Sequence, residues 1–386
     1  MTEKLYYIDS HLREFTATVI SCTEEKGRYF VALDRTAFFP EGGGQGGDIG
    51  TLGDANVTDT HERSGVILHY CDRPLPVGEI VTGWIDWTVR FARMQIHSAE
   101  HLVTGNAHRL WGCENVGFHM TEHSAVLDFG RELTAAQLTE LQTLANEAVW
   151  ANLPVNILYP TADELQHIEF RQKKELSGQI RLVEVPGIDR CACCAPHVSR
   201  TGEIGLILLT DMTRHRGGVR ITMTAGRSAL AEAAGLGASA DALSQLFSAP
   251  RDALPQAAER ILTEMEKLKA ANAEMERRYV TLLAGATPPV EGDLYLFIPG
   301  DFSSPAMRTL AEALRDKCGG VAAVFAGDDN ANWRYVLSAQ SIDLRPWAKA
   351  FNTALHGRGG GSAGMVQGSV AASRREITAY FHGNEQ

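Results

Sequence analysis

The chain has 386 residues, of which 44% are apolar, and its formal net charge at pH 7 is −11. Because this length exceeds what one hydrophobic core usually serves, the sequence predicts a folded, soluble protein of two or three domains. The acidic balance argues against a general nucleic-acid coat protein, whose non-specific binding depends on cationic contacts to phosphate.

The N-terminus and the cysteines bear on the cellular compartment. The first residues lack a basic and apolar leader, and no apolar run approaches the ~20 residues that span a bilayer. We therefore expect a cytoplasmic protein without a membrane partner. Seven cysteines is an odd number, and three of them lie between positions 191 and 194. Metal binding fits this distribution better than a disulfide framework.

A β domain is predicted in the first segment, which we place at 1–90. Short β-branched or aromatic runs separated by turn residues favour a small β-barrel; they lie at 16–20, 28–33, 66–70 and 80–85. A Gly-rich loop at 36–48 carries Glu41 and Gln45, and its glycines allow close approach of the backbone to a partner. Because no P-loop lysine follows, a substrate-facing loop and a plain tight turn are the open alternatives.

The most informative motif is an HxxxH in a run that is predicted to be helical to about Leu110. His97 and His101 lie one helical turn apart, so they can offer two imidazoles to one ion, although two unrelated histidines can also have this spacing. A CxxxH motif, Cys193 to His197, adds the ligands that Zn²⁺ prefers. Four bound ligands would make a structural zinc and three a catalytic one. Cys194 or Cys191 could replace Cys193.

Residues 91–247 are predicted to form an α+β domain with helices packed on a sheet. Thr134 to Gln137 forms a capping box that begins a second helix. A hairpin is expected at 116–129, and further strands at 155–159, 180–185, 201–209 and 218–223.

Basic residues outnumber acidic ones around the CxxxH motif, either as a local nucleic-acid site or as a solvated face. They are Arg171, Lys173, Lys174, Arg181, Arg190, Arg200, Arg214, Arg216, Arg220 and Arg227.

The third and fourth segments are a long coiled-coil-like helix at 248–288 and an α/β unit at 289–386. The helix has seam positions four and three apart, with Asn272 as the one polar member. It is expected to pair with a second copy through 254–283 or to fold back on Leu230 to Leu246. In the last unit, a Gly-rich loop at 357–361 carries Arg358, which suits contact with a phosphate or nucleotide, or is a tight turn.

These motifs come in the order found in the editing part of alanyl-tRNA synthetases. The chain resembles their free-standing relatives, the long-form AlaX-type alanyl-tRNA editing proteins, over essentially its whole length. The motifs that carry the resemblance are Phe39 to Gln45, His97 to Leu102, Cys193 to Val198, Thr201 to Gly205, Arg220-Ile221 and Ala225 to Arg227. The loop at Gly357 to Gly361 resembles that of the DHHA1-type C-terminal domain.

The resemblance implies a zinc-dependent deacylase that acts on mischarged tRNA(Ala), chiefly Ser-tRNA(Ala), with Gly-tRNA(Ala) as a second candidate. It implies that zinc is held by His97, His101, Cys193 and His197. The Gln45 loop would support recognition, and the C-terminal domain, with Arg358, would contact tRNA. Such an activity has a physical reason, since a small synthetase pocket cannot firmly reject a near-isostere with an added hydroxyl.

The hairpin after the HxxxH helix and the residue between its histidines supply the remaining site candidates. Phe118 and Thr121 are expected to line the substrate pocket, with His119 as a catalytic candidate beside them. Glu100 stands where the family often has Thr, and Cys194-Ala195-Pro196 stands where it often has Gly-Gly-Thr. Glu100 is either a general base or an outward salt-bridge residue, and we favour the second for a mid-helix glutamate.

One alternative function is a tRNA-binding accessory protein with a structural zinc and no hydrolysis, possibly dimeric through the long helix or the C-terminal domain. An aminoacylating enzyme and a DHH-type phosphoesterase fit less well. No class II catalytic domain is expected before the barrel, and no DHH metal motif occurs.

Overall fold

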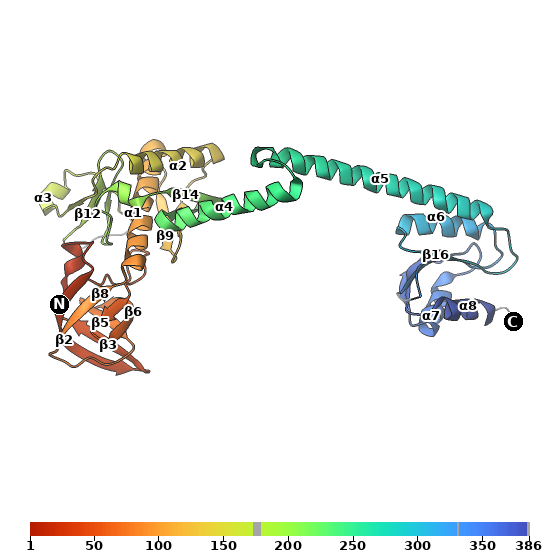
Figure 1. Ribbon diagram of the computed structural model, residues 1–386, viewed down its shortest axis with the longest axis horizontal. Helices are drawn as coiled ribbons and strands as arrows, with labels where there is room; N and C mark the ends of the chain where they lie inside the picture. The colour runs from red at the N-terminus through yellow and green to blue at the C-terminus, as the bar shows by residue number, and fades with distance from the viewer. Residues whose placement is uncertain (173–178, 330–331, 384–386) are drawn as a thin grey trace. The chain divides into compact units, whose positions relative to one another are not determined.

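The computed structural model describes residues 1–172, 179–329 and 332–383 (Figure 1). The chain divides into two compact units, Met1–Asp241 and Ala242–Gln386, and each is described by itself. The predicted division into four segments at 90, 247 and 288 stays a prediction. Within the described residues, no helix is long and apolar enough to cross a membrane.

The first part of unit 1 is a closed barrel of six antiparallel strands. In barrel order they are β2 (Glu14–Glu25), β3 (Arg28–Leu33), β7 (Val66–Cys71), β6 (Ala55–Arg63), β5 (Gly50–Leu52) and β8 (Ile80–Ile85). Alternate residues such as Phe15, Val19 and Val31 point inward to a common core. The small barrel predicted from the short runs is therefore present. Beside it, β1 (Glu3–Lys4) pairs with β4 (Arg35–Thr36), and a short 3-10 helix, η1, covers Leu5–Tyr7.

Helix α1 (Trp87–Trp111) leads from the barrel into the rest of unit 1 (Figure 1). Asp86 caps its start by accepting a hydrogen bond from the Val89 N–H, and Gly112 ends it in the left-handed conformation. Every residue from Met94 to Ala107 is buried. The centre of α1 is thus surrounded by protein on all sides, and its polar side chains must find partners there.

Helices α1 and α2 pack on an antiparallel sheet, which is the predicted α+β arrangement. The sheet order is β14 (Ile207–His215), β15 (Gly218–Ala225), β10 (Ala125–Phe129) and β9 (Asn115–Met120). Helix α2 (Ala135–Trp150) begins at the predicted capping box of Thr134 and Gln137. The predicted strand at 201–209 is wrong in its first half, because Thr201–Ile204 form a 3-10 helix, η2, whose Glu203 carboxylate caps the turn.

A second, three-stranded sheet in unit 1 carries the cysteine cluster. It consists of β11 (Asn156–Leu158), β12 (Leu182–Val185) and β13 (Asp189–Ala192), with the short helix α3 (Ala162–Leu165) between the first two. Strand β13 packs on α1. This contact brings the CxxxH motif, which follows β13, to the HxxxH helix.

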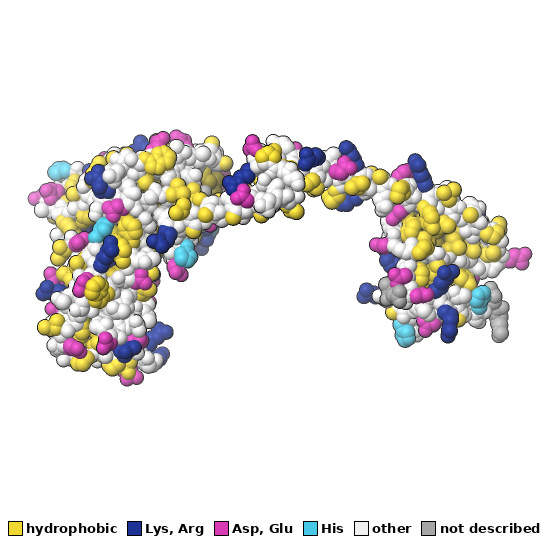
Figure 2. Space-filling view, viewed as in Figure 1, with side chains coloured by type: hydrophobic (Ala, Val, Ile, Leu, Met, Phe, Trp, Pro, Cys, Tyr) yellow, Lys and Arg dark blue, Asp and Glu magenta, His cyan; other side chains and the backbone are white. Residues whose placement is uncertain are grey.

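Two long helices follow. Helix α4 (Gly226–Phe247) is followed by a 3-10 turn, η3 (Arg251–Ala253), and by α5 (Leu254–Ala286). Most seam residues of α5 are exposed, including Ile261, Met265, Leu268, Met275 and Leu282. Figure 2 shows apolar side chains along this helix among charged ones. The exposure of the seam residues does not test pairing with a second copy or folding back on α4, and both stay predictions.

The rest of unit 2 is a five-stranded sheet with helices on both faces. Its order is β16 (Leu294–Pro299), β17 (Ala322–Gly327), β18 (Trp333–Ser338), β20 (Met365–Val370) and β19 (Arg358–Gly361). Helix α6 (Ser304–Arg315) packs with the end of α5 on one face, and α7 (Leu344–Ala354) and α8 (Arg374–Gly383) pack on the other. Ser303 caps α6 by accepting a hydrogen bond from the Ala306 N–H.

A buried ion pair ties the barrel loop to α1. The guanidinium of Arg90, with none of its surface exposed, donates to Asp48 and to the backbone carbonyls of Ser10 and Ala37. Removing one partner of such a pair leaves a buried charge and costs roughly 3–5 kcal/mol. We therefore expect Arg90→Leu to lower the free energy of unfolding by about 3–5 kcal/mol in urea denaturation.

Arg35→Leu is the matched control for that variant. Arg35 is 49% exposed and lies 3.6 Å from Glu3 and 3.7 Å from Asp34. Exposed pairs contribute about 0–1 kcal/mol, so this variant should unfold almost as the parent does. Equal effects of the two substitutions would contradict the assigned role of Arg90.

Candidate metal centre

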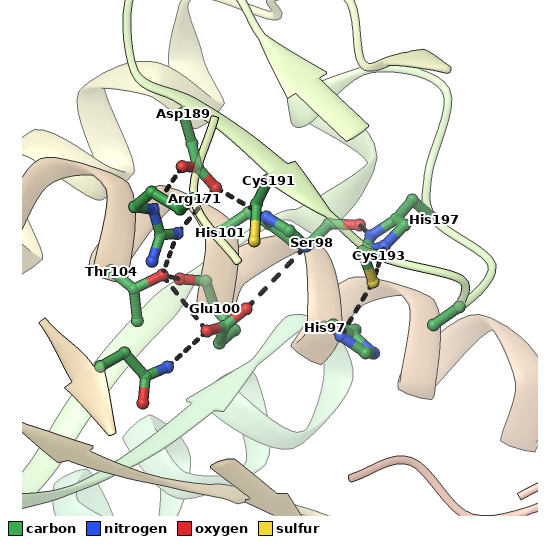
Figure 3. A network of polar contacts seen from close by, with 12 residues as sticks. His97, Ser98, Glu100, His101, Thr104, Arg171, Asp189, Cys191, Cys193 and His197 are labelled. Atoms are coloured by element: carbon green, nitrogen blue, oxygen red, sulfur yellow. Dashed lines mark hydrogen bonds and ion pairs between the residues drawn. The ribbon is translucent and has the colours of Figure 1, made fainter. Parts of the chain in front are cut away.

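Three histidines and one cysteine converge in the buried centre of unit 1. The ligand atoms of His97, His101, Cys193 and His197 all lie within 4.8 Å of one another. The Cys193 Sγ is 3.6 Å from His97 Nε2 and 3.3 Å from His197 Nε2. Figure 3 shows these side chains pointing toward one another from α1 and from the loop after β13. The structure thus brings together the four residues that the two motifs predicted.

Each of the three histidines is held through its Nδ1 atom. His97 Nδ1 lies 2.9 Å from Gln45 Oε1, His101 Nδ1 lies 2.7 Å from Asp189 Oδ2, and His197 Nδ1 lies 3.0 Å from Ser98 Oγ. A carboxylate and an amide oxygen can only accept, so His97 and His101 donate from Nδ1 and turn Nε2 toward the cluster. Metal-binding histidines are oriented in this manner.

The donor set fits a metal ion. His101 Nε2 is buried and has no hydrogen-bond partner among the described residues, although it faces the cluster. A buried polar atom without a partner is costly unless something else binds it. Imidazole nitrogens together with one thiolate are the donors that Zn²⁺ prefers.

Burial, neighbouring charges and hydrogen bonds shift the pKa values of the cluster residues in different directions. Burial lowers the pKa of His197 to about 3, so this imidazole is neutral. Burial also opposes a charge on His101, but the hydrogen bond with Asp189 and the nearby Cys193 and Glu100 outweigh it and raise the pKa of His101 to about 10. For Cys193, burial opposes the thiolate, yet the charges and hydrogen bonds of the neighbouring histidines hold its pKa well below the ordinary value.

The two other cysteines of the cluster do not join the three histidines. Cys191 is buried and lies with His101 and Asp189. Burial raises its pKa to about 12, which disfavours the thiolate. Cys194 is exposed. Of the three thiols, Cys193 is therefore the one that the geometry favours as a ligand.

The Gly-rich barrel loop contributes directly to the cluster. Gln45 from this loop holds His97, and Arg93 of α1 donates to the Gly47 carbonyl at 2.5 Å. On the other side, the Met120 N–H donates to the Gly44 carbonyl. Gly44 has φ +86°, and a Cβ there would lie 2.7 Å from the Phe118 ring. A side chain at position 44 would thus clash with Phe118 and displace the loop or the hairpin from its present position.

The hairpin residues expected in a substrate pocket do not lie together, and they differ in whether they reach the cluster. The Phe118 ring lies 4.9 Å from the His97 ring, so Phe118 adjoins the cluster. His119 is exposed and, as the next residue on strand β9, points to the opposite face. Thr121 is exposed and bonds within its own turn, to Ser124. The structure brings Phe118 to the cluster and does not bring His119 or Thr121 there.

Glu100 is not the outward salt-bridge residue that we favoured from the sequence. It is 1% exposed, and its Oε1 accepts from Asn115 Nδ2 at 2.6 Å and from Thr104 Oγ1 at 3.2 Å. Its Oε2 lies 3.9 Å from His101 Nε2. The expectation was wrong because this part of α1 has no solvent-facing side. A buried carboxylate therefore stands beside the cluster.

Most of the basic residues around the CxxxH motif have partners within the protein. Arg171 pairs with Asp189, Arg190 with Glu184, and Arg220 with Asp128. Arg181 is buried and donates to the Cys193 and Ala195 carbonyls. Lys173 and Lys174 lie outside the described residues. These pairings do not favour the interpretation of the whole stretch as a nucleic-acid site.

A cleft of about 1020 Å³ lies beside the cluster, against the second half of α1. Asn115, Arg171 and Asp189 form part of its wall. The cleft therefore adjoins the side chains that hold Glu100 and His101. In unit 2, Arg358 lines a separate cleft of about 500 Å³ with Arg345 and Lys349.

The sequence did not reveal the residues that hold the histidines. Ser98 lies inside the HxxxH motif, but nothing in the spacing indicated that its hydroxyl reaches His197. Asp189 precedes Cys193 by four residues, and its pairing with His101 depends on the packing of β13 against α1. For Arg171, the sequence suggests only membership of a basic stretch that is either a nucleic-acid site or a solvated face.

Three family models match parts of this chain. The model described as "Threonyl and Alanyl tRNA synthetase second additional domain" matches residues 180–222, and the DHHA1 domain matches residues 293–379. The model described as "tRNA synthetases class II (A)" matches residues 7–89, which include the barrel.

Curated relatives match over long stretches. An alanine–tRNA ligase of Methanobrevibacter smithii is 32% identical over 300 residues, which cover 71% of this chain and 33% of the ligase. The chain thus spans about a third of the length of that relative. The alanyl-tRNA editing protein Aarsd1 of Mus musculus is 25% identical over 391 residues, covering 96% of this chain and 95% of that protein. The resemblance predicted from the motifs is confirmed.

A solved structure, the C-Ala domain of Aquifex aeolicus alanyl-tRNA synthetase, is 18% identical and covers 25% of this chain and 93% of its own, with a TM-score of 0.20.

If the cluster holds a metal, replacing one of its histidines should remove far more bound zinc than replacing a histidine elsewhere in the chain. We expect His101→Ala to lose most of the zinc that the parent retains after dialysis, as measured by mass spectrometry of the metal. His119→Ala is the matched control, because His119 lies on the exposed face of β9. Equal zinc contents in the two variants would rule out His101 as a ligand.

Zinc affinity should rise with pH. A pKa of about 10 keeps a proton on His101 at neutral pH, and zinc must displace it from Nε2. One displaced proton gives roughly a tenfold gain in affinity per pH unit below that pKa. Chelator competition at pH 7 and pH 8 measures the slope, and Asp189→Asn should reduce it. An affinity independent of pH would contradict this protonation state.

Proposed function

We propose that this chain, a relative of the alanyl-tRNA editing proteins and of the corresponding part of alanine–tRNA ligases, deacylates mischarged tRNA(Ala). Ser-tRNA(Ala) is the chief substrate proposed, with Gly-tRNA(Ala) second, and the cytoplasm is the proposed compartment. The observation that carries the proposal is the cluster of three anchored histidines and Cys193 beside the buried carboxylate of Glu100.

Similarity supports the substrate class. Aarsd1, which is named as an alanyl-tRNA editing protein, aligns with this chain almost from end to end. The residues around the CxxxH motif match a domain that is named for threonyl and alanyl tRNA synthetases. An aminoacyl-tRNA ester is therefore the first substrate to test.

His97, His101, Cys193 and His197 are the residues that would hold zinc. Bound there, zinc would supply Lewis-acid polarisation of the ester carbonyl. Gln45, Asp189 and Ser98 keep the three imidazoles in place, so the histidines need not reorganise during the reaction. A hydrolytic role also requires a coordination position for substrate or water, through three protein bonds or expansion to five ligands.

Glu100 is the proposed general base. In this scheme its carboxylate takes a proton from the attacking water, whose oxygen bonds to the ester carbonyl carbon. The bond to the ribose oxygen then breaks, and the proton is passed to that oxygen, which gives free amino acid and tRNA. The hydrogen bonds from Asn115 and Thr104 fix the carboxylate for this step.

Gln45 and Phe118 are proposed to contact the substrate. The Gln45 Nε2 is buried and has no hydrogen-bond partner among the described residues, while its Oε1 holds His97. A substrate oxygen would satisfy this donor. His119 and Thr121 are not part of the proposed pocket, because the first points away from the cluster and the second bonds within its turn.

Unit 2 is proposed to contact tRNA and to assist self-association. Arg358, Arg345 and Lys349 share one cleft, where their charges suit phosphate. The exposed seam of α5 suits pairing with a second copy through 254–283. Neither role is needed for the chemistry of the cluster.

A tRNA-binding accessory protein with a structural zinc is the second candidate. The observation in its favour is that four protein groups can close a tetrahedral shell without leaving a place for water. This alternative predicts tRNA binding by the parent and by His97→Ala, with no hydrolysis by either.

A deacylation assay separates the two. We expect the zinc-loaded chain to hydrolyse Ser-tRNA(Ala) faster than buffer does, to spare Ala-tRNA(Ala), and to stop when a chelator removes the metal. Glu100→Gln should lower kcat by roughly 10²–10⁴-fold, the usual contribution of a general base.

Glu140→Gln on the exposed side of α2 is the matched control and should leave kcat unchanged. Release of serine no faster than in buffer would refute the hydrolase proposal. Full activity of Glu100→Gln would refute only the assigned base.

A further inference from the structure

Arg171 lies at the junction of strand β13 and helix α1. Its backbone N–H donates to the Arg190 carbonyl, and its own carbonyl accepts from the Ala192 N–H, so the residue is fastened along β13. Its side chain extends toward α1 and is only 10% exposed. The cation is therefore largely removed from solvent and takes its partners from the protein.

The guanidinium of Arg171 holds two separate side chains (Figure 3). Its Nε and one terminal nitrogen donate to the two carboxylate oxygens of Asp189, at 2.7 and 2.9 Å. The same terminal nitrogen donates to Thr104 Oγ1 at 2.8 Å. Asp189 holds His101, and Thr104 contacts Glu100. Arg171 is thus connected, through one intervening side chain in each case, to a metal-ligand candidate and to the proposed base.

We propose that Arg171 is a positioning residue that sets the orientation of His101 through Asp189 and of Glu100 through Thr104. The first arm of this proposal, which runs through Asp189 to His101, concerns metal binding alone. The second arm rests on the proposed function, because it assumes that Glu100 acts on the substrate.

The physical basis of the first arm is the fork of two parallel hydrogen bonds. A carboxylate held at one oxygen can rotate, whereas a bidentate guanidinium fixes its plane. Asp189 Oδ2 then accepts from His101 Nδ1 along a set direction, which aims the opposite Nε2 at the cluster. Partners one shell out from a metal typically change its affinity 10–100-fold when they are altered.

The second arm depends on the single proton of the Thr104 hydroxyl. Because Thr104 Oγ1 accepts from Arg171, its own proton is directed to Glu100, whose backbone carbonyl lies at 2.9 Å and whose Oε1 lies at 3.2 Å. Without the arginine, the hydroxyl could rotate and the carboxylate would lose a fixed donor.

Arg171→Lys tests the first arm because it keeps the positive charge and removes the fork. Arg220→Lys is the matched control: Arg220 makes the same two-point contact with Asp128, at 2.7 and 2.8 Å, on the sheet of the same unit. The readouts are the zinc dissociation constant by chelator competition, the visible spectrum of the cobalt(II)-substituted protein, and kcat and KM for Ser-tRNA(Ala).

We expect Arg171→Lys to weaken zinc binding by about 10–100-fold and to shift the cobalt(II) bands, whereas Arg220→Lys matches the parent in both. At saturating zinc, the kcat of Arg171→Lys should fall while its KM for tRNA stays unchanged. A role as a phosphate contact predicts the opposite, a changed KM with normal metal binding. Parent-like zinc affinity and cobalt(II) spectrum in folded Arg171→Lys would overturn the proposal.

Thr104→Val separates the arms and serves if Arg171→Lys does not fold. It removes the hydroxyl with little change in shape and leaves the contact between Arg171 and Asp189. We expect parent-like zinc affinity with a lowered kcat, and an unchanged kcat would overturn the second arm. A parent chain that binds zinc but releases no serine would sink the proposed function, while the zinc measurements on Arg171→Lys would still decide the first arm.

Discussion

The anchoring of each histidine through Nδ1 is the constraint on which the candidate metal centre depends. In the buried stretch of α1 and in the buried loop after β13, a polar side chain without a partner would destabilise the fold. Asp189, Gln45 and Ser98 meet that need for His101, His97 and His197. Because these bonds use Nδ1, the three Nε2 atoms face inward together with the Cys193 thiol. The hydrogen bonds that give the buried histidines their partners therefore also assemble the donor set of the cluster.

Three separated parts of the chain must come together to build this centre. Helix α1 supplies two histidines, the segment around β13 supplies Asp189 and the CxxxH motif, and the barrel loop supplies Gln45. The loop is held by the buried pair of Arg90 and Asp48, so the barrel helps to position the Gln45 side chain that holds His97. Buried ion pairs contribute little net stability. The role that fits this one is to fix the position of the loop against α1.

Local patterns in the sequence were enough to predict the metal-ligand candidates, because helical spacing puts His97 and His101 on one face and the CxxxH motif adds Cys193 and His197. The barrel was also predictable from a local pattern, its short β-branched or aromatic runs, and the start of α2 from the capping box of Thr134 and Gln137. The orientation of Glu100 was not, since a mid-helix glutamate is usually exposed and only the packing of α1 buries it. The sequence does contain the reason why His119 lies apart from the cluster: adjacent residues on a strand face opposite ways, so His119 cannot share the side of Phe118.

X-ray absorption at the zinc edge of the purified 386-residue chain tests most directly whether these side chains form a metal centre. The account predicts one sulfur at about 2.3 Å and two or three imidazole nitrogens at about 2.0–2.1 Å, with the sulfur signal lost in Cys193→Ser. A shell without sulfur, or one that keeps its sulfur in Cys193→Ser, would contradict it.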